Sequence, residues 1–337
     1  MSTNSTAVYL SAPDDLSIET TTTIVTVNIV ALVGVISIFG IACNIINILV
    51  FCKQGFSETT NISYTALAIS DLLSLINSWC LSVFWNPWFL NSGLPVVFFD
   101  IQTVFATWPY ACFSRINGLV TAFVTFERCL CVVWPLQVKR ILTSTVTIIV
   151  LISIYFIMCL VMVPVYSIST LGWRSEPWTN MTLLGVIMGE NAELISNISY
   201  TVQSATQLFA FFTVSVCTAT LIACLKQNTK WRAKQSTTQN AIKKVIKRQS
   251  KAIKMVTLIA ATYVISQLPT IISLAVTVLY SDFGPVGRYK NLFLAFWTFL
   301  LVCGVLNSTV NLVVYYVMSS KFRQSCNQIL SKLLINN

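Results

Sequence analysis

The chain has 337 residues, of which 55% are hydrophobic and only 9% are charged, and its formal net charge is +10 at pH 7. Soluble globular domains carry about 25% charged residues, so this composition excludes a water-soluble domain and indicates that lipid covers most of the surface. Histidine is absent from the sequence, which excludes a metal site that depends on imidazole ligands.

Seven apolar segments of the sequence are long enough to cross a bilayer, which takes about 20 residues. We expect helices, because in hydrocarbon each backbone polar group must be satisfied within its own segment. The sequence therefore predicts an all-α membrane protein in which seven transmembrane helices form one bundle over residues 24–318. The predicted spans are Ile24–Cys52, Ile62–Trp85, Ile101–Trp134, Ile141–Tyr166, Tyr200–Leu225, Ala252–Tyr280 and Asn291–Met318.

The distribution of lysine and arginine predicts the orientation of the bundle. Residues 1–23 contain neither, whereas basic residues follow spans three, five and seven. Because cytoplasmic loops carry an excess of basic residues, we expect residues 1–23 outside the cell, the carboxyl terminus inside, and a multi-pass location in the plasma membrane. Anionic lipid accounts for the positive charge, so we expect no nucleic-acid partner.

Residues 319–337, after span seven, are predicted to form a cytoplasmic amphipathic helix and tail. Basic residues flank an apolar stripe with helical spacing, which favours a helix that lies on the inner leaflet; a disordered tail is the alternative. Cys326 in this segment is a candidate for palmitoylation. The stripe consists of Phe322, Cys326, Ile329, Leu330, Leu333 and Leu334.

Three glycosylation sequons lie in segments that this orientation places outside, at Asn4, Asn180 and Asn197. Two further sequons, at Asn61 and Asn307, fall inside the cell or within a span, so we expect them to remain unmodified.

Several polar residues lie within the predicted spans, where each needs a partner or a hydrated cavity. Their order and spacing resemble those of the rhodopsin-like (class A) G-protein-coupled receptors over nearly the whole chain. Glu127-Arg128-Cys129 at the end of span three resembles the Asp/Glu-Arg-Tyr motif of that family, and Pro135-Leu136 follows it. The other matching positions are Asn44 in span one, Leu67-Ala68-Ile69-Ser70-Asp71 in span two, Pro269 in span six, Asn311-Leu312-Val313-Val314-Tyr315 in span seven, and Phe322-Arg323 after it.

The resemblance implies an activation switch formed by Glu127, Arg128, Pro269, Asn311 and Tyr315. Glu127 would hold Arg128 at rest, and Tyr315 would swing inward on activation. Pro269 bends span six, because proline removes a backbone hydrogen bond and clashes with the preceding turn.

The resemblance also implies a hydrated polar pocket in the middle of the membrane. In the family such a pocket often holds sodium with the aspartate as a ligand, and the alternative is a hydrogen-bond network without an ion. We expect no other cofactor. The residues of this pocket would be Asn44, Asp71, Asn117, Asn307 and Asn311.

The sequence departs from the family pattern in several places, and spans four and five also lack the tryptophan and proline that are usual there. Cys129 stands where tyrosine is usual, Leu312 where proline is usual, and Gln267 where the family has tryptophan. The outer disulfide has no cysteine at either end, so loop Ser167–Ser199 must be held by packing or left mobile. The residues around Cys129 resemble those of invertebrate chemosensory receptors, especially molluscan ones.

One face of span three is the candidate ligand-binding surface, with Tyr110, Ser114 and Arg115 at helical spacing. Gln267 and Thr270 of span six would add polar contacts. Arg115 lacks an obvious acidic partner. It is either a handle for an anionic ligand, since guanidinium pairs well with carboxylate or phosphate, or a structural group bonded to carbonyls or to a loop acid such as Glu190 or Glu193.

These features predict a receptor that transmits binding of an extracellular ligand to a heterotrimeric G protein. A chemosensory small molecule is the preferred ligand and a neuropeptide is the alternative. A transporter or channel would show internal repeats and discontinuous spans, which the sequence lacks. An enzyme is the least favoured class, because no nucleophile–base set is evident.

Overall fold

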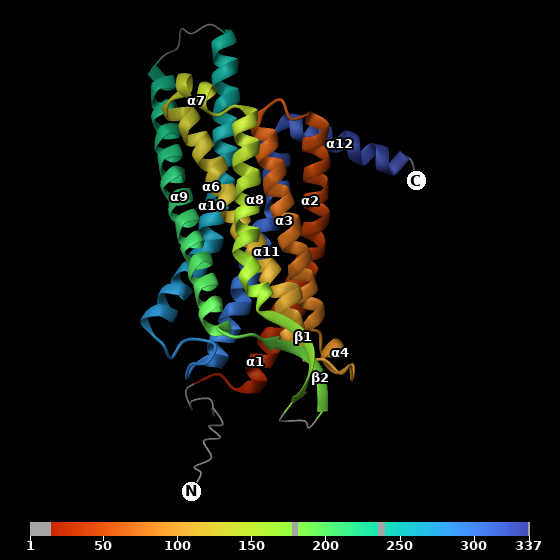
Figure 1. The fold of residues 1–337 in the computed structure, drawn as a ribbon. Helices are drawn as coiled ribbons and strands as arrows, with labels where there is room; N and C mark the ends of the chain where they lie inside the picture. Colours follow the sequence, from red (N-terminus) through yellow and green to blue (C-terminus); the bar gives the residue numbers. More distant parts are fainter. Residues whose placement is uncertain (1–14, 177–180, 235–239, 336–337) are drawn as a thin grey trace.

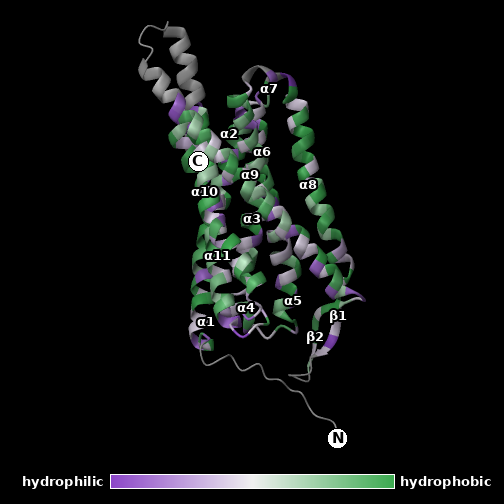
Figure 2. Cartoon of the chain, turned by 90° about the vertical axis from the view of Figure 1, so that its left-hand side faces the viewer, coloured by the Kyte–Doolittle hydropathy of each residue, from purple (hydrophilic) through white to green (hydrophobic). Residues whose placement is uncertain are grey.

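Seven long apolar helical segments run side by side in the computed structural model, which describes residues 15–176, 181–234 and 240–335 (Figure 1). Figure 2 shows that these helices are hydrophobic along most of their length, with more hydrophilic residues near their ends. The predicted fold class, a seven-helix membrane bundle followed by a further helix, is therefore confirmed.

The elements follow the predicted order along the chain. Span one comprises α1 (Ile18–Val25), the π-helical η1 (Thr26–Val33) and α2 (Gly34–Gln54), and span two is α3 (Thr59–Phe84). The short α4 (Pro87–Leu90) precedes span three, which comprises α5 (Phe98–Gln102), the π-helical η2 (Thr103–Thr107) and α6 (Trp108–Val133). Then come α7 (Pro135–Ile141), α8 (Ser144–Ser167), β1 (Ser169–Glu176), β2 (Met181–Met188), α9 (Ala192–Lys234), α10 (Asn240–Leu279), α11 (Lys290–Met318) and α12 (Ser320–Ile335).

Most helices extend beyond their predicted apolar cores. The first begins at Ile18, because the Ser17 hydroxyl accepts a hydrogen bond of 3.1 Å from the Thr20 amide and caps it. Helix α10 begins at Asn240, so the basic stretch before span six continues that span as a helix. Polar and charged residues sustain helices in water, so hydropathy alone underestimates helix length.

The two ends of the bundle carry different elements (Figure 1). One end carries α1, α4 and the β1–β2 hairpin, and we call it the hairpin end. The opposite end carries α7 and α12, and we call it the α12 end. The Asp15 carboxylate caps span seven at the hairpin end, where it accepts hydrogen bonds from the backbone amides of Asn291 (3.1 Å) and Leu292 (3.0 Å).

The connection between spans four and five contains an antiparallel β-hairpin that the sequence analysis did not predict. Its register runs from Ser169 opposite Met188 to Glu176 opposite Met181. Strand β2 reads Met-Thr-Leu-Leu-Gly-Val-Ile-Met, an apolar run without the alternation that identifies a strand. The protein is therefore a helical bundle, as predicted, with one two-stranded hairpin that was not predicted.

The hairpin is attached to the start of span three by charge and by backbone bonds. The Asp100 carboxylate lies 3.2 Å from the Arg174 guanidinium and accepts a hydrogen bond of 2.8 Å from the Val186 amide. Arg174 also donates to the Val186 carbonyl at 2.8 Å. A Cβ added to Gly185 would lie 2.9 Å from the Asp100 carboxylate, so glycine permits this approach. We call the Asp100, Arg174 and Val186 contacts the hairpin clamp; they hold the loop where the family has a disulfide.

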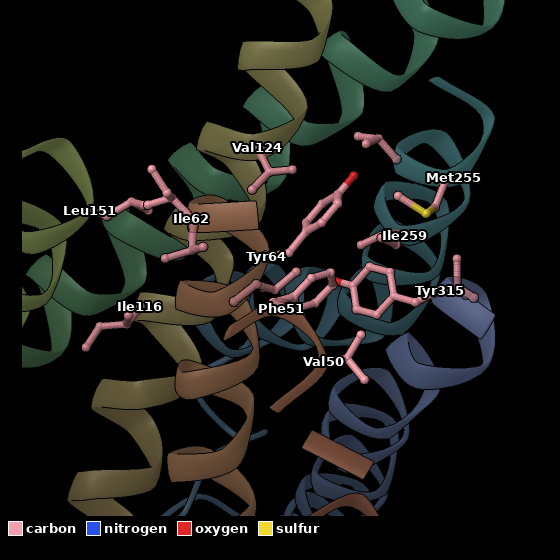
Figure 3. Close-up of a cluster of buried hydrophobic side chains, with 14 of the residues drawn as sticks. Val50, Phe51, Ile62, Tyr64, Ile116, Val124, Leu151, Met255, Ile259 and Tyr315 are labelled. Carbon is pink, nitrogen blue, oxygen red and sulfur yellow. The ribbon is translucent and has the colours of Figure 1, made fainter. Parts of the chain in front are cut away.

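Helix α12 packs against the bundle through an aromatic cluster at the α12 end. The ring of Phe51 lies 5.5 Å from Tyr64, 5.1 Å from Tyr315 and 5.3 Å from Phe322, measured between centroids. Figure 3 shows Phe51, Tyr64 and Tyr315 gathered in this cluster. Because Phe322 is buried, the apolar face of α12 contacts protein at its start rather than lipid alone.

The same packing bears on the expected palmitoylation of Cys326. The side chain is 3% exposed within the cluster, and burial raises the pKa of its thiol. Acylation needs an accessible, nucleophilic sulfur, so it would require α12 to lift from the bundle.

Candidate functional site

Asp71 lies at the centre of a polar network that joins three spans. Its carboxylate accepts a hydrogen bond of 2.5 Å from the Asn117 amide group and one of 2.8 Å from that of Asn311. Asp71 is completely buried. The structure therefore brings together α3, α6 and α11 through three of the residues predicted to form the mid-membrane pocket.

The remaining two pocket residues lie beside this network. Asn44 donates hydrogen bonds to the backbone carbonyls of Ser308 (2.9 Å) and Gly40 (3.0 Å), and so ties α2 to α11. Asn307 lines an enclosed cavity of about 10 Å³ together with Ser74 and Asn117. A cavity of that size accommodates about one water molecule.

The chemistry of these residues fits the sodium ion that the resemblance implies. Carboxylate, amide and hydroxyl oxygens are ligands for hard cations. Each carboxylate oxygen of Asp71 accepts one amide hydrogen bond, and an ionised carboxylate has about four lone-pair sites in all. The alternative is the same network without an ion. A sodium-dependent rise in melting temperature that potassium does not reproduce would distinguish the two.

Glu127 and Arg128 form an ion pair of 2.6 Å near the α12 end. Side chains of span two form hydrogen bonds with both members of the ion pair. The Thr59 hydroxyl donates to Glu127 at 2.6 Å, and Arg128 donates to the Thr60 hydroxyl at 2.7 Å. Ser63 adds a bond of 3.2 Å to Glu127. These contacts satisfy the buried carboxylate, so the pair is fastened to α3 as well as to its own helix.

Sequence reasoning missed the three hydroxyl residues of α3. Thr59, Thr60 and Ser63 fall within one helical turn at the α12 end of span two, and that polar cluster beside a span was the available signal.

The other switch residues lie on α10 and α11, and of these Asn311 belongs to the Asp71 network. Pro269 lies inside α10, where its missing amide hydrogen weakens the helix. Tyr315 is 1% exposed and packs within the aromatic cluster, and its hydroxyl group has no hydrogen-bond partner among the described residues.

The structure brings together some of the predicted ligand-binding residues. Tyr110, Ser114 and Gln267 line the same small cavity as Asn307, whereas Arg115 and Thr270 do not line it. Gln267 also accepts a buried hydrogen bond of 2.6 Å from Gln207 of α9, a residue that the sequence analysis did not single out. This bond joins spans five and six.

Arg115 does not line this cavity and has no acidic partner in the part of the chain that the structure describes. Its Nε atom is buried without a hydrogen bond. The groups close enough for electrostatic interaction with it are Tyr110 and Tyr263, both of them neutral phenols. The loop acids Glu190 and Glu193 are exposed and form no ion pair with it, so the structure does not support that part of the structural alternative.

The glycosylation sequons are only partly covered by the structure. Asn197 is exposed near the start of α9 at the hairpin end. Asn4 and Asn180 lie outside the described residues. Asn61 is buried and donates a hydrogen bond of 2.8 Å to the Gly55 carbonyl, which is consistent with the expectation that its sequon stays unmodified.

Comparison with protein families gives a match over most of the chain. Residues 21–315 match the family described as 7 transmembrane receptor (rhodopsin family). A search of curated protein sequences gave no match. The matched segment reaches into all seven spans and contains every switch residue named above, from Glu127 to Tyr315. The chain is therefore a multi-pass membrane protein that belongs to the rhodopsin family of seven-transmembrane receptors.

Proposed function

We propose that this receptor transmits the binding of an extracellular ligand at the hairpin end to a heterotrimeric G protein at the α12 end. The observation that carries the proposal is the Glu127–Arg128 ion pair, fastened to span two by Thr59 and Thr60. A charged pair in this position is costly to bury, and both partners are hydrogen-bonded. This favours a pair that holds the resting state, which we call the latch, over a passive structural contact.

The charge distribution supports the proposed orientation in the plasma membrane. Lys53, Lys321 and Arg323 lie on exposed surfaces near the α12 end, and α9 and α10 carry basic residues toward the same end. This excess of positive charge favours the cytoplasmic side. The hairpin end and the amino terminus would then face the outside.

We propose a small chemosensory ligand with a negative charge, and a neuropeptide as the alternative. Arg115 is a cation in span three that has no acidic partner among the described residues. Tyr110, Ser114 and Gln267 offer no acid to an ammonium group, which disfavours an amine. A screen of small acids, amino acids and amidated peptides against cells expressing the receptor and a promiscuous G protein would separate these classes.

Replacement of Arg128 tests the proposed coupling. We expect Arg128→Gln to abolish ligand-stimulated guanine-nucleotide exchange while ligand binding remains, because the charge that the latch releases toward the G protein is lost. The matched control is Arg288→Gln at the hairpin end, which should retain exchange. Exchange that persists at the wild-type rate in Arg128→Gln would refute the proposed mechanism.

A further inference from the structure

Two hydrogen-bond donors lie buried and unpaired where spans three and six meet. Arg115 of α6 has its Nε atom buried without a partner, and Tyr263 of α10 has its hydroxyl oxygen buried without a partner. Tyr263 is 1% exposed. Buried polar groups are almost always hydrogen-bonded, so two such groups in one region point to a missing partner.

Glycine at position 118 permits the close approach of these two helices. A Cβ atom added to Gly118 would lie 2.6 Å from the Tyr263 hydroxyl oxygen. Gly118 follows Arg115 by three residues, so both lie on the same face of α6. The ring of Tyr263 packs among Ala122, Ala210 and other apolar residues, which fixes its direction. The hydroxyl group therefore points at the α6 face that carries Arg115.

Arg115 has no ion-pair partner among the described residues and no hydrogen bond at its Nε atom, unlike Asp71 and Glu127, acids of spans two and three. Glu127 is paired with Arg128, and Asp71 accepts two amide hydrogen bonds. Arg115 interacts with Tyr110 and Tyr263, and neither phenol carries a charge at neutral pH. A lone guanidinium in hydrocarbon is strongly unfavourable, so this site calls for a negative charge.

We propose that a small anion binds between Arg115 and Tyr263 and bridges α6 to α10. Guanidinium N–H and phenol O–H groups are both donors, which suits an anion better than water, because water would leave the positive charge unneutralised. The anion is either free chloride or the carboxylate of a small organic ligand.

The consequence of the bridge rests on the proposed function. Tyr263 precedes Pro269 by six residues, so it lies on the portion of α10 between the proline and the α12 end. That portion is the one expected to move on activation. An anion held by Arg115 and Tyr263 therefore sets the position of the moving helix.

Thermal unfolding of the purified receptor in nanodiscs tests the site. The midpoint is measured in sodium chloride, sodium acetate and sodium gluconate at equal ionic strength, with gluconate as the anion too large to enter. We expect a saturable rise of the midpoint with chloride or acetate over gluconate. A rise with chloride alone assigns an inorganic anion, and a larger rise with acetate assigns a carboxylate.

Variants of Arg115 and Tyr263 test whether the anion-dependent shift of the unfolding midpoint arises at these two donors. We expect Arg115→Gln to lose the anion-dependent shift, Tyr263→Phe to reduce it, and Arg288→Gln to retain it. Gly118→Ala, which displaces the hydroxyl group, should weaken it as Tyr263→Phe does. An unfolding midpoint of the wild type that is the same in all three salts would overturn the proposal, as would an undiminished shift in Arg115→Gln. If Arg115→Gln fails to fold, the anion titration of the wild type and the shift measured in Tyr263→Phe still test the proposal.

Nucleotide exchange measured on the same preparation separates this proposal from the proposed function. An anion-dependent shift without exchange on any G protein would refute the coupling and leave the site intact. Ligand-stimulated exchange without an anion-dependent shift would refute the site and leave the coupling intact.

Discussion

Arg128 illustrates how single side chains determine the state of this receptor. Its guanidinium group binds Glu127 on its own helix and Thr60 on span two, at 2.6 and 2.7 Å. Hydrogen bonds to a charged group contribute about 1.5–3 kcal/mol each. A resting state held by two such bonds can be shifted by removing one of them.

Thr60→Val is predicted to raise basal signalling. The change removes the hydroxyl group that accepts the bond from Arg128 and nearly preserves the side-chain shape. Loss of a bond worth about 1.5 kcal/mol, the lower end of the range for hydrogen bonds to a charged group, should raise basal guanine-nucleotide exchange by about tenfold. The measurement is exchange in the absence of ligand.

Thr65→Val is the matched control for this experiment. The Thr65 hydroxyl donates to the Asn61 carbonyl of its own helix at 2.7 Å and forms no hydrogen bond with Glu127 or Arg128. Basal exchange in this variant should match the wild type. Equal basal rates in Thr60→Val and Thr65→Val would show that Thr60 does not hold the latch.

At the scale of the element, the β1–β2 hairpin is held by the hairpin clamp. The clamp depends on the Asp100 carboxylate, which binds Arg174 and the Val186 amide at once. Two further backbone bonds join Leu184 to Val97 and Pro95, at 2.9 and 2.8 Å. The hairpin thus has several points of attachment, none of which is covalent.

Asp100→Asn is predicted to loosen the hairpin. The amide keeps one acceptor but loses the charge that attracts Arg174, so local opening of residues 181–188 should become easier by about 1–2 kcal/mol. Hydrogen–deuterium exchange of these amides measures the change. Glu58→Gln breaks an exposed contact of 3.7 Å with Lys321 at the other end and should leave the hairpin unaffected.

The same experiment distinguishes this attachment from a covalent one. The hairpin residues 169–188 contain no cysteine, so a thiol reductant should leave their protection unchanged. Protection in Asp100→Asn equal to that of the wild type would assign the attachment to the backbone bonds and packing alone.

The helical elements were predictable from sequence because hydrocarbon imposes length and hydropathy on each span. The order of the spans and the proximity of Asp71 to Asn117 followed from that pattern and from the resemblance. The hairpin was not predictable, since β2 is apolar on both faces and reads as a buried segment of either type. Hydropathy also assigns no partner to a polar residue. Thr60 and Gln207 acquire their roles only through neighbours from other spans.

At the scale of the whole molecule, the bundle has two differently built ends. The hairpin end is fastened by the hairpin clamp and by Asp15 on span seven. At the α12 end, the aromatic cluster joins α2, α3, α11 and α12, while Pro269 leaves span six weakened along its length. This contrast favours movement of α10 at the α12 end, which is the movement that coupling to a G protein requires.

The most direct test of this account measures that movement. Spectroscopic labels introduced through an unnatural amino acid at Lys53 of α2 and Lys251 of α10, both exposed near the α12 end, report the distance between spans one and six. We predict that the distance increases when an activating ligand and a G protein are added, and that Arg128→Gln abolishes the accompanying nucleotide exchange. An unchanged distance while ligand-stimulated exchange proceeds would contradict the account.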